Sequence, residues 1–294
     1  LYDGNAHAPV AVLGNLANNM VANTLLSFEY SRRGIAGTAT AASANAGNWQ
    51  VTVSLRSPDD NIVLTGTTAL YIIRQLEASV SFTDGDEQTF EYNTESHPVT
   101  GEVVGLIGAD RGKVKPVISY YEGDVLLTGA PVKAGTYKAV ATLPENSNYI
   151  LDGSYSAQIV INKKNVSVHW AGNAQNENAF EWTFDGTGKT PKATASNPYA
   201  SGNFVLTVEY APYISGVAGA WTTTVPVNAG TYAMRVSLQN ADAQRNFRLL
   251  ETQKEFVIGQ REVTVGWVDG NGNAVTPNAD GVVIWQYDGE GHTV

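Results

Sequence analysis

A glycine turn followed by an alternating strand occurs three times in this sequence of 294 residues. The copies read Asn45-Ala-Gly-Asn-Trp49, Lys133-Ala-Gly-Thr-Tyr137 and Asn228-Ala-Gly-Thr-Tyr232, and they begin 88 and 95 residues apart. Apolar residues then occupy every second position, as Val51, Val53 and Leu55 do in the first copy. A period of two after a glycine turn predicts a strand with one face on a core. The chain is therefore expected to consist of domain-sized repeats.

Two shorter phrases recur in the same order within each repeat. An aromatic residue opens a turn near the start of each unit, in Tyr2-Asp3-Gly4, Tyr92-Asn93-Thr94, Phe184-Asp185-Gly186 and Tyr287-Asp288-Gly289. An asparagine followed by an apolar residue comes 11 to 14 residues after each aromatic strand start, in Asn61-Ile62, Asn148-Tyr149 and Asn246-Phe247. No segment keeps a helical apolar pattern for three turns. About seven short strands per ~90 residues predict an all-β fold of tandem immunoglobulin-like β-sandwich repeats.

The repeat boundaries follow from places where a closing strand is directly followed by an opening one. They divide the chain into repeat 1 (residues 1–77, lacking its opening strand), repeat 2 (78–163), repeat 3 (164–260) and the opening part of a fourth repeat (261–294). Linkers this short predict an elongated molecule.

These motifs resemble the MBG/YDG-type tandem repeats of large bacterial surface proteins. The resemblance rests on Tyr-Asp-Gly near a unit's start, Asn-Ala-Gly-Thr-Tyr late in it, and Asn-Tyr-x-Leu before the closing strand. Repeat 2 departs from it with Tyr92-Asn-Thr, and repeat 1 with Trp49 in place of the tyrosine. The resemblance implies an extracellular, adhesin-like or stalk-like protein on the bacterial cell surface.

Composition excludes several classes of protein. The formal net charge of −10 argues against a nucleic-acid partner, which would require clustered Lys and Arg. The chain has no cysteine, which excludes disulfides and thiolate sites. No apolar run approaches the ~18 residues of a membrane span, so no membrane insertion is expected. The acidic excess is confined to residues 76–163 and 260–294, which excludes an acidic surface shared by all repeats.

The histidines are not expected to be catalytic. His7, His97 and His292 each lie five residues after the unit's tyrosine, and Lys189 takes that place in repeat 3. A catalytic base would not be interchangeable with lysine, so a turn or strand-edge role is predicted. His169 alternates with Val168 and is expected to face solvent.

The tryptophans could stack on sugars, but five of the six recur at strand positions where a buried core is the default. These five are Trp49, Trp170, Trp182, Trp267 and Trp285. Trp49, Tyr137 and Tyr232 are predicted to be buried equivalents. Trp221 lies in a stretch that differs between repeats, and either inward packing, which we favour, or an exposed platform is compatible with the sequence.

Two further motifs are interpreted as structural. Asp269-Gly-Asn-Gly-Asn273 resembles the start of a calcium loop, but Ala274 stands where glycine is required, so a hairpin turn is predicted. Asn165-Val-Ser167 fits a glycosylation sequon at a strand start.

The sequence therefore predicts a non-catalytic spacer or adhesion module, with no catalytic, metal or cofactor residues and an unspecified ligand site. The alternative is a binding module that recognises a host glycan or extracellular-matrix protein through the loops of one repeat. An enzyme ranks third. Head-to-tail self-association is a further expectation, because residues 261–294 carry the opening strand that repeat 1 lacks.

Overall fold

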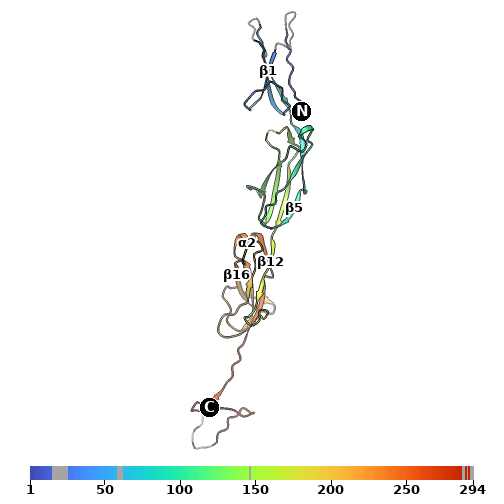
Figure 1. The fold of residues 1–294 in the computed structure, drawn as a ribbon. Helices are drawn as coiled ribbons and strands as arrows, with labels where there is room; N and C mark the ends of the chain where they lie inside the picture. Colours follow the sequence, from blue (N-terminus) through green and yellow to red (C-terminus); the bar gives the residue numbers. More distant parts are fainter. Residues whose placement is uncertain (15–25, 58–61, 146, 287–288, 290, 292–294) are drawn as a thin grey trace. The chain divides into compact units, whose positions relative to one another are not determined.

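The computed structural model describes residues 1–14, 26–57, 62–145, 147–286, 289 and 291, and its regular secondary structure is almost entirely β-strand (Figure 1). The chain divides into two compact units. Unit 1 contains Leu1–Lys164 together with Asp242–Arg248, and unit 2 contains Asn165–Ala241 and Leu249–Val294. The short segment Asp242–Arg248 thus belongs to unit 1, although the chain on both sides of it belongs to unit 2.

Repeat 1 forms one antiparallel sheet in the part that the structure describes. Its strands are β1 (Leu26–Arg32), β2 (Gly47–Leu55) and β3 (Thr68–Ile73), in the order β1-β2-β3. Tyr30 lies opposite Val51, and Trp49 lies opposite Tyr71. The face that carries these residues is only partly covered, since Trp49 and Tyr71 are half-buried.

Repeat 2 is a sandwich of two sheets. The first has the order β10-β4-β6, from Tyr149–Leu151, Leu76–Phe82 and Gly101–Val104. The second has the order β5-β11-β9-β7-β8, from Glu87–Glu91, Tyr155–Asn162, Gly135–Thr142, Val117–Glu122 and Val125–Leu126. A single 3-10 turn, η1, covers Gly108–Asp110.

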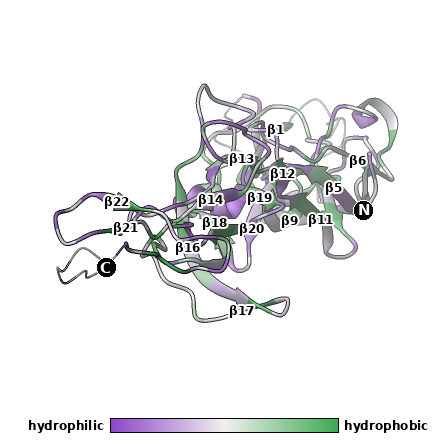
Figure 2. Cartoon of the chain, turned by 90° about the horizontal axis from the view of Figure 1, so that it is seen from below, coloured by the Kyte–Doolittle hydropathy of each residue, from purple (hydrophilic) through white to green (hydrophobic). Residues whose placement is uncertain are grey.

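The core of repeat 2 lies between these two sheets. Val80 and Phe82 of β4 pack against Tyr137, Ala139 and Ile159 of the second sheet. Figure 2 shows hydrophobic residues along β9 and β11, where every second side chain is buried. The residues predicted to face the core at every second position of these strands are therefore the buried ones.

Unit 2 repeats this arrangement. Its large sheet has the order β14-β20-β18-β16-β17, from Glu181–Thr183, Gln253–Gly259, Gly230–Leu238, Leu206–Ile214 and Val217–Ala218. Three strand pairs lie in the described chain after Asn162: β12 (Lys164–Ser167) with β19 (Phe247–Leu250), β13 (His169–Ala171) with β15 (Lys192–Thr194), and β21 (Trp267–Val268) with β22 (Ala274–Val275).

The predicted fold class, tandem immunoglobulin-like β-sandwiches, is confirmed. Strands β2, β9 and β18 all begin at the recurring glycine turn and occupy the same place in their sheets. The outer strand of each large sheet pairs in parallel, β5 with β11 and β14 with β20. The core of unit 2 is built from Tyr210, Met234 and Phe256 at matching positions.

The sequence did not predict α2 (Ala241–Asn246), a six-residue helix that precedes Phe247. A helix this short carries no apolar periodicity, so the sequence pattern gave no signal for it. Among the described residues, no helix is long and apolar enough to cross a membrane.

Candidate interaction site

The aromatic residue of each recurring turn folds back onto the turn's first carbonyl. Trp49 Nε1 donates to the carbonyl oxygen of Asn45 at 2.9 Å, and the Tyr137 hydroxyl donates to that of Lys133 at 2.6 Å. The Tyr232 hydroxyl donates to Asn228 at 2.9 Å in the same way.

This closure explains the glycine in the turn. A Cβ atom on Gly135 would lie 3.1 Å from the Tyr137 hydroxyl, and one on Gly230 would lie 3.3 Å from the Tyr232 ring. Both separations are shorter than ordinary van der Waals contact. Glycine therefore leaves room for the aromatic ring to close over the turn.

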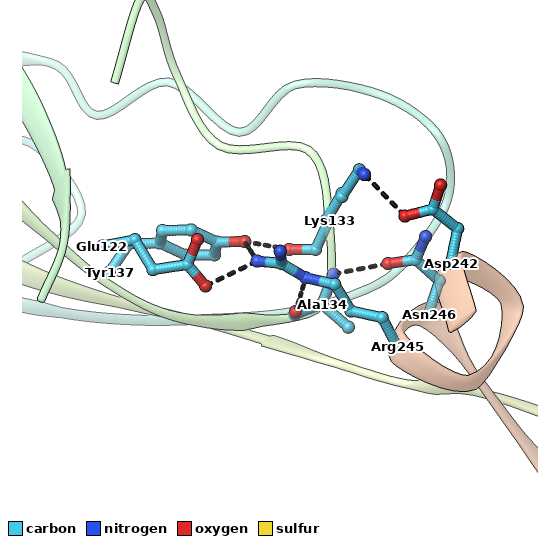
Figure 3. A network of polar contacts seen from close by, with 7 residues as sticks. All are labelled: Glu122, Lys133, Ala134, Tyr137, Asp242, Arg245 and Asn246. Carbon is cyan, nitrogen blue, oxygen red and sulfur yellow. Dashed lines mark hydrogen bonds and ion pairs between the residues drawn. The ribbon is translucent and has the colours of Figure 1, made fainter. Parts of the chain in front are cut away.

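An asparagine side chain caps the turn of repeat 2. The Asn246 Oδ1 atom, at the end of α2, accepts the backbone N–H of Ala134 at 2.9 Å, and both residues are buried (Figure 3). A buried N–H without an acceptor costs ~1–3 kcal/mol, so this bond satisfies a group that the fold has removed from water. We call such a contact, an asparagine side-chain oxygen on the alanine N–H of the turn, an asparagine cap.

Arg245 surrounds this cap with charged hydrogen bonds. Its guanidinium donates to Glu122 Oε1 at 2.5 Å, to the Tyr137 hydroxyl at 2.9 Å and to the carbonyl of Ala134 at 3.1 Å (Figure 3). The hydrogen bond that Arg245 donates to Glu122 raises the pKa of Arg245. Burial raises the pKa of Tyr137, although Arg245 works in the opposite direction.

Two lysines complete the contact between α2 and repeat 2. Lys133 Nζ pairs with Asp242 Oδ1 at 2.7 Å, which lowers the pKa of that carboxyl. Lys163 Nζ donates to the carbonyl of Gln244 at 2.7 Å. The Lys133–Asp242 pair is largely exposed, so solvent screens it and it contributes little to stability. The buried cap is therefore expected to matter more than this ion pair.

A second asparagine cap lies at the turn of repeat 1. Asn148 Oδ1 accepts the Ala46 N–H at 2.9 Å, and the Asn148 side-chain amide donates to Asn45 Oδ1 at 3.2 Å. Ala46 is only 1% exposed. Gln75 donates to the carbonyls of Ser147 and Tyr149. In the other copy the residue that corresponds to Gln75 is Lys163, which donates to the carbonyl of Gln244.

The aromatic residue after each capping asparagine packs on the aromatic residue that opens the preceding repeat. Tyr149 meets Tyr2 edge-on with ring centroids 5.5 Å apart, and Phe247 meets Tyr92 edge-on at 5.2 Å. Edge-to-face pairs of this kind are a favoured aromatic geometry. The same two-part contact, an asparagine cap and an aromatic pair, is therefore built twice in unit 1.

The first copy adds a carboxylate between two tyrosines. Asp110 Oδ2 accepts the hydroxyls of Tyr2 at 2.6 Å and Tyr149 at 3.0 Å. The bond to Asp110 raises the pKa of Tyr2 to about 12. Phe247 has no hydroxyl, so this arrangement is specific to the first copy.

The histidine that follows the opening tyrosine of repeat 1, His7, contacts the turn. Asp3 Oδ1 accepts the Asn5 N–H and lies 2.9 Å from His7 Nε2, contacts that lower the pKa of Asp3 to about 2. In repeat 3, Lys189 pairs with Asp185 at 2.6 Å across the same spacing. Because histidine and lysine occupy the same place beside an aspartate, the predicted turn role of His7 is confirmed.

His97 differs from His7, since it is buried and stacks on Phe90 with ring centroids 4.3 Å apart. Its Nε2 atom has no hydrogen-bond partner among the described residues. Burial lowers the pKa of His97. His169 is exposed, as predicted, whereas His292, Tyr287, Asp288 and Asn61 lie outside the described residues.

The prediction that the tryptophans are buried in the core is wrong, because these side chains are only partly buried. Trp49, Trp170, Trp182 and Trp285 are half-buried, and Trp267 is 49% exposed. Tyr232 is also half-buried, whereas its equivalent Tyr137 is 4% exposed. Tyr137 belongs to the core of repeat 2, and its hydroxyl also accepts a hydrogen bond from Arg245 of α2, a contact that Tyr232 lacks among the described residues. Trp221 is half-buried, with the Arg235 guanidinium 4.3 Å above its ring.

The remaining motifs are structural. Asp269 Oδ1 accepts the backbone N–H groups of Asn271 and Asn273 in the hairpin between β21 and β22, so the predicted turn is confirmed. Asn165 and Ser167 lie in β12. Within the part of the chain that the structure describes, no cluster of His, Asp or Glu could hold a metal ion.

The sequence shows that the Asn–apolar phrase recurs but does not indicate what it contacts. The signal is its recurrence at a similar place after the glycine turn, 11 residues after Tyr137 in Asn148-Tyr149 and 14 residues after Tyr232 in Asn246-Phe247. Arg245 and Glu122 gave no such signal, because Ser147 and Arg32 stand at the corresponding positions of the other copy.

Comparison with known proteins leaves the family open. No protein-family model matches the chain, and no curated protein matches it significantly. Among solved structures, the chain is similar to immunoglobulin domains 1–4 of Sidekick-1, with a TM-score of 0.26 and 10% sequence identity. The match covers 82% of this chain and 69% of that one.

Proposed function

We propose that this chain is a non-catalytic repeat region of a bacterial cell-surface protein, acting as an adhesin spacer or adhesion module. The observation that carries the proposal is the asparagine cap, which joins Asn148 to Ala46 and Asn246 to Ala134 at the same place in successive repeats. Contacts that repeat with the sequence are the property of a tandem array, in which each unit stabilises its neighbour.

The polar side chains also support a non-catalytic role. Asp3, Asp185 and Asp269 accept backbone N–H groups in turns, and Arg245 is occupied by Glu122 and Tyr137. These groups serve the fold, so they are not available to form a nucleophile and base.

A cell-display experiment tests the spacer role. An epitope is fused to the N-terminal end of the chain, the other end is anchored to a bacterial surface, and antibody-coated beads are captured. Deleting residues 76–163 should lower capture, because the epitope moves closer to the surface. Unchanged capture at equal display level would contradict the spacer role.

The alternative function is recognition of a host glycan or matrix protein by the loops of one repeat. The residue that favours it is Trp221, because the Arg235 guanidinium lies over its ring and the side chain is only half-buried. The full chain and Trp221→Ala should be compared on a glycan array and on immobilised matrix proteins. Binding that Trp221→Ala abolishes would favour the alternative, whereas no binding by either chain favours the spacer.

A further inference from the structure

The turn of repeat 3 carries the same parts as the two capped turns. The Tyr232 hydroxyl closes over Asn228-Ala229-Gly230 as Tyr137 closes over its own turn. The Phe184 N–H donates to the Gly259 carbonyl at 2.9 Å, as the Tyr92 N–H donates to the Asn162 carbonyl at 2.8 Å. Gln260 follows two residues after Ile258, as Gln75 follows Ile73.

This third turn differs from the other two in being uncovered. Ala46 is 1% exposed and Ala134 is 6% exposed, whereas Ala229 and Gly230 are both exposed to solvent. Within the described part of the chain, the Ala229 N–H has no acceptor. Both capping asparagines, Asn148 and Asn246, are already bound to other turns.

An open pocket of about 330 Å³ lies beside this turn. It is lined by Tyr232 together with Pro212, Thr222, Val225 and Asn228, among others. Pro212 lies opposite Tyr232 in the ladder between β16 and β18. By the same register, Glu122 is its equivalent in repeat 2, so the pocket corresponds to the place where Arg245 lies against Glu122 and Tyr137.

The lining of the pocket indicates what would fill it. Pro212 offers no carboxylate, so an arginine before the capping asparagine would find no ion-pair partner there. The Ser147-Asn148-Tyr149 segment of repeat 2, with a small neutral residue before the asparagine, fits this surface better than Arg245-Asn246-Phe247 does.

We propose that the face formed by Phe184, the turn Asn228–Tyr232 and Gln260 is a docking surface for a further repeat of this kind. The occupant is a segment with the chemistry of Ser147-Asn148-Tyr149. Its asparagine oxygen would accept the Ala229 N–H, its aromatic ring would pack on Phe184, and its backbone carbonyls would accept the Gln260 amide. This proposal rests on the proposed function as a tandem array.

Hydrogen exchange at single amides tests the proposal in two steps. In the chain as it stands, the Ala46 and Ala134 amides should exchange slowly and the Ala229 amide quickly. Asn148→Ala should release Ala46 alone, and Asn246→Ala should release Ala134 alone. These variants establish that an asparagine cap is what protects each amide.

The second step supplies the missing partner. Residues 1–260 are continued by a second copy of residues 76–163, which places Leu76 after Gln260 as it follows Gln75 in the natural chain. Exchange at Ala229 should slow by at least about tenfold, and the Asn148→Ala change in the added copy should reverse this. Fast exchange at Ala229, with the amide of Ala139 in the added copy protected, would overturn the docking surface. That result would leave the spacer role, which cell display tests, unaffected.

Discussion

Asn246 Oδ1 accepts the Ala134 N–H 112 residues earlier in the sequence, and Asn148 does the same for Ala46 across 102 residues. In both cases the asparagine belongs to the sequence of one repeat and the alanine to the repeat before it. The capped turn directly precedes a strand, β9 or β2, that has a neighbour on each side in its sheet. The cap therefore links the start of this strand in one repeat to the Asn–aromatic segment of the next.

Removing the asparagine cap should destabilise the repeat whose turn it covers. Asn246→Ala leaves the buried Ala134 N–H without an acceptor, and the expected loss is ~1–3 kcal/mol of unfolding free energy. Asn178→Ala is the matched control, because Asn178 is exposed and lies in a turn. Denaturant unfolding of the three chains measures the difference, and equal midpoints for Asn246→Ala and Asn178→Ala would contradict a stabilising cap.

The two equivalent tyrosines should respond differently to loss of the hydroxyl. Tyr232→Phe removes one hydrogen bond, to Asn228, with an expected cost of ~0.5–1.5 kcal/mol. Tyr137→Phe also removes an acceptor of Arg245, so its cost should be larger, ~1–3 kcal/mol. Thermal unfolding of both variants tests this order. A larger effect at Tyr232 would contradict the importance of the Arg245 contact.

Stability should fall as the pH is lowered through the region below 6.5, because of His97. Burial holds the pKa of folded His97 below its value of 6.5 in the unfolded chain, so the unfolded state binds the proton first. Unfolding free energy is therefore lost as the pH falls from 6.5 towards the lower pKa of the folded state. His97→Phe keeps an aromatic ring on Phe90 and should flatten this dependence. Parallel pH profiles for the two chains would show that His97 is not responsible.

Self-association through residues 261–294 should depend on their exposed opening segment, which would pair as a strand with another chain. Val263 and Val265 are 83% and 72% exposed, whereas the equivalent Val80 and Val166 are buried in their sandwiches. The sheet β1-β2-β3 of repeat 1 has a partly covered apolar face that such a strand could complete. Sedimentation velocity should show concentration-dependent growth that is lost when residues 260–294 are deleted. Two monomeric chains at high concentration, with repeat 1 folded in both, would exclude this association.

The parts of the fold that could be predicted from the sequence are the strands in which apolar and outward-facing residues alternate. Val80 and Phe82, or Ala139 and Ala141, are separated by one outward residue, and this spacing alone indicates a strand with an inner face. The degree of burial at Tyr137 and Tyr232 could not be predicted, because the covering group comes from residues more than 100 positions away in one case and is absent from the described residues in the other. A local sequence pattern carries no information about a side chain that contacts it from a distant part of the sequence.

The candidate site could be predicted only in part from the sequence, for a related reason. A recurring Asn–aromatic phrase reveals that some contact is repeated, as in Asn148-Tyr149 and Asn246-Phe247, but not which backbone group receives it. Arg245 and Glu122 form one private ion pair, which no comparison between repeats could reveal.

The capping asparagine and the capped alanine occupy two different positions of the repeated sequence. Each repeat therefore contains both an asparagine that can cap and an alanine turn that can be capped. A crossover between two misaligned copies of the gene segment, in which one whole period is gained or lost, would leave each asparagine facing an alanine turn. The contacts that belong to one copy alone, such as Arg245 with Glu122 and Asp110 with Tyr2, would be mismatched at the new junction. Arrays of this type can therefore change their number of repeats by recombination without a compensating substitution at the shared contact.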